Sequence, residues 1–274
     1  MAEELAMHSG SIFTRKSNTY SEHPDLINWM LVDKANPITC IADLIDSGQK
    51  IVDIGCGAGL LGRLIHRNYP DVYISGIDPS IEADHQGLAI YKNFFCGGLE
   101  QALEYKWVRE ADFYIFADVI EHIVQPDIFL RSLVEICPPN ATFIFSVPNV
   151  AYFANRLDLL FGNWDYSDSG IKEFTHLRFL TLKTIKSILQ SAGLQVHSIS
   201  FLNRSLSPEP LKNYSLIKVL WACFLMKKET FPLAYQFVIV AKKIPTKEIE
   251  FHDNGSTSKL DWLISLSKFL IKRI

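Results

Sequence analysis

A glycine-rich turn directly after a short apolar segment constrains this chain more than any other feature. Residues 51–54 read Ile-Val-Asp-Ile, and glycine follows at every second position, as Gly55, Gly57 and Gly59. Four apolar residues then follow helical spacing: Leu60, Leu61, Leu64 and Ile65. A strand, a glycine turn and a helix in this order build a ligand site at the carboxyl edge of an open α/β sheet. Glycine suits the turn because it accepts positive φ and lets a ligand approach the backbone.

Two ligand classes compete for this turn. Gly57 to Gly62 matches G-x-G-x-x-G, which places a dinucleotide pyrophosphate at a helix N-terminus, whereas Asp53 to Gly59 reads D-x-G-x-G-x-G. Gly55 is the first glycine after the strand, so Gly62 falls inside the helix, where we expect it to serve close packing. Asp53 would repel a pyrophosphate but attract an ammonium group. This favours S-adenosylmethionine, which carries an amino group and a sulfonium but no phosphate.

A second acidic residue follows the next predicted strand. Residues 72–77 end at Asp78 and Pro79. An acid roughly 20 residues past the glycine turn can accept hydrogen bonds from ribose hydroxyls. Alternatively, Asp78 caps the next helix, with Pro79 at its first position. NAD and S-adenosylmethionine share this ribose, so Asp78 supports a cofactor site without choosing between them.

Charge and cysteine content exclude several other classes of protein. The chain has 274 residues and is 48% apolar, which suffices for one substantial core. Its net charge of −3 shows no basic excess, so nucleic acid is not favoured as a substrate. Five scattered cysteines form no C-x-x-C pair and are odd in number, which argues against a zinc site and a disulfide framework. Without a signal-peptide pattern at the N-terminus, a reducing cytoplasm is the expected location.

Alternating apolar segments predict a parallel α/β sheet with helices on both faces. Helices are expected over Pro126 to Ile136 and Leu182 to Ser191. Strands are expected at residues 51–54, 72–77, 93–96, 112–117, 141–147, 195–201 and 235–241.

The chain is expected to have three parts: an N-terminal helical cap (1–47), a central domain (48–247), and a linker with a C-terminal amphipathic helix (248–274). The central domain contains two long insertions, 148–180 (here called the lid) and 202–234, and such segments usually cover a functional edge. The C-terminal helix would pack on the domain or a partner subunit, or lie on an anionic membrane surface. The lid is rich in aromatics, which predict an acceptor pocket, a small satellite core, or both: Tyr152, Phe153, Phe161, Trp164, Tyr166, Phe174 and Phe179.

Two later turns carry a resemblance to a known family. Asp118-Val119-Ile120-Glu121-His122 follows the fourth strand, and Ser146-Val147-Pro148-Asn149 ends the fifth. With the glycine turn and Asp78, they resemble the class I S-adenosylmethionine-dependent methyltransferases, in the branch that includes the ubiquinone-biosynthesis O-methyltransferases. Residues 164–171 and 175–181 are similar to methyltransferases often found with bacterial surface-polysaccharide biosynthesis. The resemblance implies a Rossmann-like sheet of order 3-2-1-4-5-7-6 with the last strand antiparallel, and S-adenosyl-L-methionine as the methyl donor.

The resemblance also implies which residues hold the donor, with one departure. The family commonly has Gly-Asp after the third strand, with the acid near adenine, whereas this chain has Gly97-Gly98 and leaves only backbone near Leu99. The implied cofactor-binding residues are Asp53, Gly55, Cys56, Gly57, Gly59, Asp78, Pro79, Leu99, Asp118 and Val119.

Methyl transfer to an alcohol or phenol needs a group that removes the acceptor's proton. The acceptor must lie roughly 3 Å from the methyl, opposite the sulfur, and histidine suits the proton removal near neutral pH. His122 is the leading candidate base, although it could instead orient or pack the turn. His176, in the lid, could approach from the acceptor side or form a hydrogen bond that folds the lid. Glu121 and His122 alone are too few ligands to predict a metal.

The sequence therefore predicts a methyltransferase that O-methylates a small molecule or a glycan intermediate. Two alternatives remain open. One is a non-catalytic scaffold that binds S-adenosylmethionine in a glycan-biosynthesis complex. It is compatible with the missing acid at Gly98 and with the C-terminal segment 248–274. An NAD(P)-dependent oxidoreductase rests on the match of the segment from Gly57 to Gly62 to G-x-G-x-x-G.

Overall fold

The computed structural model describes residues 36–80, 88–203 and 234–244. Most of the predicted N-terminal cap, nearly all of the second insertion and the predicted C-terminal helix lie outside these residues. The lid lies entirely within them.

Seven strands form one sheet in the order β3-β2-β1-β4-β5-β7-β6. The first five strands pair in parallel, and β7 runs antiparallel to both β5 and β6. This confirms the order, the antiparallel last strand and all seven predicted strands. Their bounds are β1 Lys50–Ile54, β2 Tyr73–Asp78, β3 Asn93–Cys96, β4 Phe113–Ala117, β5 Thr142–Pro148, β6 Leu194–Asn203 and β7 Ala234–Lys243.

The composition of the strands follows their place in the sheet. Central strands of a parallel sheet are covered on both faces and therefore carry continuous apolar runs. In β5, the five residues from Phe143 to Val147 are all buried. The edge strand β6 instead mixes exposed and buried positions along its ten residues. Phe116 and Phe145 stack across neighbouring central strands with ring centroids 4.9 Å apart.

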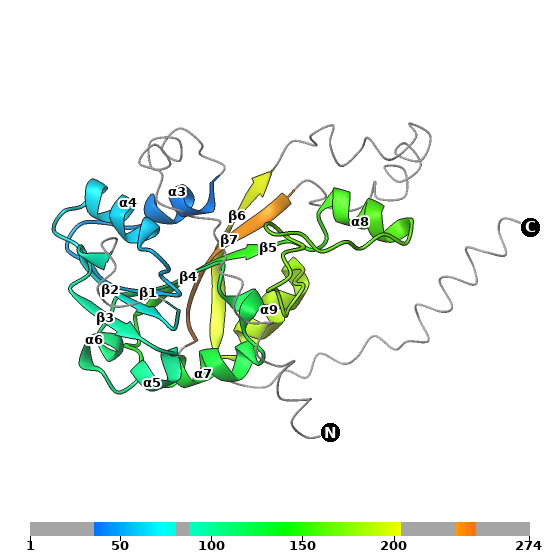
Figure 1. Cartoon of the computed structure of the whole chain (residues 1–274). Coiled ribbons are helices and arrows are strands. Elements are labelled where there is room, and N and C mark those ends of the chain that lie inside the picture. The colour runs from blue at the N-terminus through cyan, green and yellow to red at the C-terminus, as the bar shows by residue number, and fades with distance from the viewer. Residues whose placement is uncertain (1–35, 81–87, 204–233, 245–274) are drawn as a thin grey trace, which may run out of the picture. The chain divides into compact units, whose positions relative to one another are not determined.

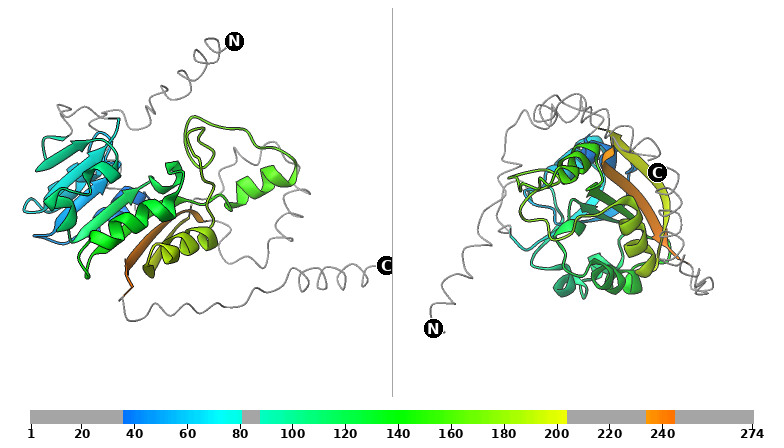
Figure 2. Two further views of the ribbon diagram at one scale, coloured as in Figure 1. Left: turned by 90° about the horizontal axis from the view of Figure 1, so that it is seen from below. Right: turned by 90° about the vertical axis from the view of Figure 1, so that its right-hand side faces the viewer.

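Helices cover both faces of the sheet, as the sequence predicted (Figures 1 and 2). One face carries α3 (Pro37–Ala42) and α4 (Leu60–Asn68), which pack over Ile51, Ile115 and Ile144. The other face carries α5 (Leu99–Ala102), α6 (Lys106–Arg109), α7 (Pro126–Ile136) and α9 (Leu182–Ser191). The bounds of α7 and α9 agree with the prediction. Within the described part of the chain, no helix is long and apolar enough to cross a bilayer.

The lid holds one helix, α8 (Phe153–Leu160), which lies beyond the carboxyl end of β5 (Figures 1 and 2). Some of its aromatic residues form small local packing groups. Tyr152 packs with Ala154 and Ile171 in a core of its own. Trp164 meets Phe179 edge to face with ring centroids 5.0 Å apart. These contacts agree with the expectation of a satellite core in the lid.

Candidate active site

The glycine loop, residues 53–59, has the backbone that the sequence predicted for it. Gly55, Gly57 and Gly59 have φ angles of 69°, 49° and 78°, values that strongly favour glycine. The backbone N–H groups of Gly55 and Cys56 donate to the carbonyl of Ile77 at 2.7 and 3.2 Å, so the loop crosses the end of β2. A Cβ placed at Gly57 would meet no atom within 4 Å. The loop therefore leaves open space beside its backbone, which fits a bound cofactor.

Asp78 organises this loop from the end of β2. Its Oδ2 accepts from the Gly57 N–H at 2.9 Å, and its Oδ1 accepts from the N–H and hydroxyl of Ser80 at 2.8 and 2.7 Å. A carboxylate has about four acceptor sites, so these three bonds leave capacity for a ribose hydroxyl. The helix that Asp78 and Pro79 were also expected to start falls in residues outside the described ranges.

The turn after β4 touches the glycine loop. A Cβ at Gly55 would lie 2.6 Å from Val119 Cγ2, so the loop and this turn pack against each other. Asp118 is the one non-glycine residue with positive φ (57°) among the described residues. A φ in this region marks a strained backbone, which often occurs at functional sites.

Two residues that the sequence analysis did not select hold Asp118 in place. The Ser146 hydroxyl accepts from the Asp118 N–H at 3.0 Å and donates to its Oδ1 at 2.7 Å. Gln236 Nε2, from β7, donates to the same oxygen. Burial raises the pKa of the Asp118 carboxyl, while these two hydrogen bonds and the nearby His122 oppose that rise. The Ser-Val-Pro-Asn turn thus contributes to the site through its serine.

On the predicted adenine side, Gly98 stands at the position where the family commonly has an acid. The Leu99 side chain is buried in the core, which leaves its backbone as the possible ligand contact. A Cβ at Gly98 would meet only the flexible end of Glu100, at 3.1 Å. Gly98 in place of the family's acid therefore leaves space at this position and provides no side chain to contact adenine.

Glu121, His122 and His176, here called the histidine cluster, bring together the turn after β4 and the lid. The turn includes a short 3₁₀ helix, η3 (Ile120–His122). The two imidazole centroids lie 4.8 Å apart at an interplanar angle of 76°. The lid is attached here by the N–H groups of Leu177 and Arg178, which both donate to the Glu121 carbonyl at 2.9 Å.

Hydrogen bonds assign the tautomers of both histidines. Nδ1 of His122 lies 3.2 Å from the Thr175 carbonyl oxygen, and Nδ1 of His176 lies 3.0 Å from that of Ile171. Because a carbonyl only accepts, each Nδ1 carries a hydrogen, and in the neutral ring Nε2 then keeps its lone pair. His122 is exposed, so its Nε2 can meet an acceptor, whereas His176 is buried. The lid-folding alternative for His176 therefore fits the structure better than a second base.

The Glu121 carboxyl is the unusual group of the cluster. It is 1% exposed, and neither of its oxygens has a hydrogen-bond partner among the described residues. Burial raises its pKa well above the ordinary range, and burial lowers the pKa of His176, whose Nε2 lies 4.0 Å from Glu121 Oε1. Both shifts favour the neutral forms of the two groups over an ion pair.

The cluster also has the composition of a metal site. One ligand atom from each of its three residues lies within 4.8 Å of the others. Each histidine donates its Nδ1 hydrogen to a carbonyl, as metal-bound histidines usually do. The sequence alone offered two ligands, and the fold of the lid adds His176 as a third.

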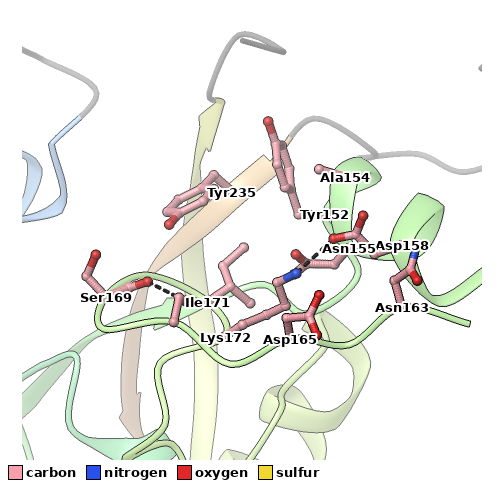
Figure 3. A pocket seen from close by; sticks show the side chains of 11 residues that line it. Tyr152, Ala154, Asn155, Asp158, Asn163, Asp165, Ser169, Ile171, Lys172 and Tyr235 are labelled. Atoms are coloured by element: carbon pink, nitrogen blue, oxygen red, sulfur yellow. Dashed lines mark hydrogen bonds and ion pairs between the residues drawn. The ribbon is translucent and has the colours of Figure 1, made fainter. Parts of the chain in front are cut away.

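A pocket of about 340 Å³ lies between α8, the rest of the lid and β7 (Figure 3). Lys172 Nζ crosses it to Asp158 Oδ2 at 2.8 Å, and the rings of Tyr152 and Tyr235 meet edge to face at 5.3 Å. Ile171 lines the pocket, and its carbonyl oxygen accepts from Nδ1 of His176 in the histidine cluster. Of the seven predicted acceptor aromatics, the wall contains only Tyr152. The lining residues are Tyr152, Ala154, Asn155, Asp158, Asn163, Asp165, Ser167, Ser169, Ile171, Lys172 and Tyr235.

The strand order and the loop at its carboxyl edge define a class I methyltransferase fold. A family model described as "Methyltransferase domain" matches residues 33–199, and the chain belongs to this family.

Curated relatives of the chain are similar over part of their length. The mitochondrial ubiquinone biosynthesis O-methyltransferase of Homo sapiens is 27% identical over 164 residues, which cover 56% of this chain and 43% of that protein. The ubiquinone biosynthesis O-methyltransferase of Bradyrhizobium diazoefficiens is 32% identical over 110 residues, or 37% of this chain and 41% of that protein. The chain thus spans about half the length of the curated relatives it matches.

Solved structures share the fold. A SAM-dependent methyltransferase from Archaeoglobus fulgidus superposes with a TM-score of 0.55 at 16% identity, covering 83% of this chain and 97% of that one. The plantazolicin methyltransferase BamL, solved in complex with a triazolic desmethylPZN analog and SAH, superposes with a TM-score of 0.51 at 15% identity, covering 84% of this chain and 94% of that one. These likenesses agree with the predicted class I architecture.

Proposed function

We propose that this protein is an S-adenosylmethionine-dependent methyltransferase that methylates an oxygen of a small molecule or glycan intermediate. The observation that carries the proposal is the contact between the glycine loop and the turn that bears His122, through Val119 and Gly55. This contact supports a cradle for the methyl donor close to the turn that carries the candidate base. The names of the curated relatives, which are O-methyltransferases, support oxygen as the methylated atom.

Each residue of the site has a definite part in this proposal. S-adenosylmethionine, when bound, supplies a methyl group that its sulfonium makes electrophilic. The glycine loop contacts it through backbone, Asp53 faces its ammonium group, Asp78 accepts from its ribose and the backbone at Leu99 faces its adenine. His122 takes the hydroxyl proton of the acceptor on Nε2, while its Nδ1–H bond to Thr175 holds the ring in the required tautomer.

The lid pocket is the proposed acceptor site. Eight of its eleven lining residues carry an amide, carboxyl or hydroxyl group, and the paired tyrosines offer apolar ring surface. Asp158 neutralises Lys172, so among the described residues that line the pocket there is no uncompensated cation to select an anionic acceptor. These features favour a neutral, hydroxyl-rich molecule. A glycan intermediate satisfies this description. A cytoplasmic location, and contacts of the C-terminal segment 248–274 with a membrane or a partner, stay predictions.

A turnover assay with pocket variants tests the acceptor proposal. Release of S-adenosylhomocysteine is measured with a panel of sugars, polyols and phenols, and we expect turnover with hydroxyl-rich neutral acceptors. Asp165→Ala should raise the KM for an active acceptor about tenfold, because a hydrogen bond to a charged group contributes roughly 1.5 kcal/mol. Asp46→Ala, an exposed aspartate outside the pocket, is the matched control.

The same assay separates an enzyme from the scaffold alternative. Cofactor binding without turnover on any acceptor would favour a non-catalytic scaffold. Turnover that responds equally to Asp165→Ala and Asp46→Ala would remove the lid pocket from the acceptor site.

A further inference from the structure

Asp53 has a partner that lies far from it in the sequence. The Tyr91 hydroxyl donates to Asp53 Oδ2 at 2.7 Å, across 38 positions of the chain. Asp53 is 1% exposed and Tyr91 is 8% exposed, so this bond is shielded from water. A hydroxyl that donates to a buried carboxyl orients it and stabilises its charged form.

Two glycines make room for the tyrosine ring. A Cβ at Gly62, in α4, would overlap the Tyr91 hydroxyl, and a Cβ at Gly76, in β2, would lie 2.9 Å from Tyr91 Cδ1. Neither glycine has positive φ, so space rather than backbone conformation requires them. This confirms the packing role predicted for Gly62 and identifies the group that it packs against.

The groups that face Asp53 have opposing effects on the pKa of its carboxyl. Burial raises its pKa to about 7, Tyr91 opposes this rise through its hydrogen bond, and the charge of Asp78 adds to it. The Cys56 thiol also lies nearby and stays protonated, because burial and the two aspartates raise its pKa strongly. Among the described residues that face Asp53, Tyr91 is therefore the group that favours the carboxylate.

We propose that Tyr91 is a positioning residue of the methyl-donor site, which orients Asp53 and keeps it charged for the ammonium group of the donor. Asp53 sits at the base of the glycine loop, and its carboxyl can meet a cation there only if it is held toward the loop and ionised. The inference rests on the proposed function, because it takes the donor's amino-acid end to lie in this loop.

Two ligands that differ only in the relevant group test the proposal. S-adenosylhomocysteine carries the amino-acid end, and 5′-methylthioadenosine lacks it. We expect Tyr91→Phe, which keeps the ring and removes the hydroxyl, to weaken S-adenosylhomocysteine binding at pH 7 about tenfold, the effect of one hydrogen bond to a charged group. Binding of 5′-methylthioadenosine should stay within about twofold of the parent protein.

The pH dependence of binding gives a second readout. Affinity for S-adenosylhomocysteine should fall as the pH drops through the Asp53 pKa, because the neutral carboxyl no longer attracts an ammonium group. Loss of the Tyr91 hydroxyl raises that pKa, so the fall should begin at higher pH in Tyr91→Phe. Asp53→Asn, which cannot ionise, should show no such fall, and Tyr91→Phe added to it should cost little more.

The outcomes are distinct. An unchanged affinity and pH midpoint in Tyr91→Phe would overturn the proposal, as would equal losses for both ligands, which indicate general disruption of the loop. If the parent protein binds neither ligand, the proposed function fails instead.

Discussion

Replacing His122 with alanine should lower kcat by about 10² to 10⁴ and leave cofactor affinity nearly unchanged, as expected for the loss of a general base. The Nδ1 hydrogen of this exposed histidine is committed to the Thr175 carbonyl, so in the neutral ring Nε2 is the atom that can accept a proton. It stands on the turn that packs against the glycine loop through Val119. This turn contacts the glycine loop on one side through Val119 and the lid through the Glu121 carbonyl.

The measurement is a pair of assays on the same protein, turnover at saturating donor and titration with S-adenosylhomocysteine. His197→Ala on β6 serves as the control histidine and should change neither. A collapse of cofactor affinity in His122→Ala would place His122 in the cofactor site instead.

Chelation of divalent cations distinguishes a His122 that acts as a base from a His122 that binds a metal. If His122 acts alone as a base, removal of divalent cations should leave turnover intact. If the histidine cluster holds a metal, a chelator should abolish turnover, an added divalent cation should restore it, and Glu121→Gln should lose this response. The second test is needed because the buried Glu121 carboxyl has no hydrogen-bond partner among the described residues.

Replacing Gly55 with alanine should weaken cofactor binding by more than tenfold and lower the free energy of unfolding. Two costs add at this position. A φ of 69° disfavours alanine by about 1–2 kcal/mol, and the new methyl would lie 2.6 Å from Val119 Cγ2. Relief of the overlap would push the glycine loop away from the turn after β4, which carries His122.

Gly57→Ala is the matched variant for this prediction. Gly57 also has positive φ, but a Cβ there meets no atom of the protein within 4 Å. It should therefore destabilise the fold less than Gly55→Ala, while the methyl narrows the space left for the cofactor. Chemical denaturation and titration with S-adenosylhomocysteine measure the two effects. Equal stability of the two variants would contradict the role given to Val119.

The sequence predicted most of the fold because its signals are local. Apolar runs located the central strands, and helical spacing gave the bounds of α7 and α9. Glycines with positive φ marked the cofactor loop, and the position of Gly62 inside a helix predicted a packing role. The strand order came from the resemblance, since periodicity does not determine which strands are neighbours.

The remaining parts of the site depend on contacts between distant residues. Tyr91 reaches Asp53 across 38 positions, and Gln236 reaches Asp118 across 118. His176 joins Glu121 only because the lid folds back onto the turn after β4. The pocket likewise combines the lid with Tyr235 of β7. No local pattern in the sequence marks such pairs.

Calorimetric titration of the intact chain with S-adenosylmethionine tests the central proposal most directly, with NADH as the comparison ligand. We expect saturable binding of S-adenosylmethionine at one site, with a dissociation constant well below millimolar, and no binding of NADH. Absence of S-adenosylmethionine binding at millimolar concentration, or tighter binding of NADH, would contradict it.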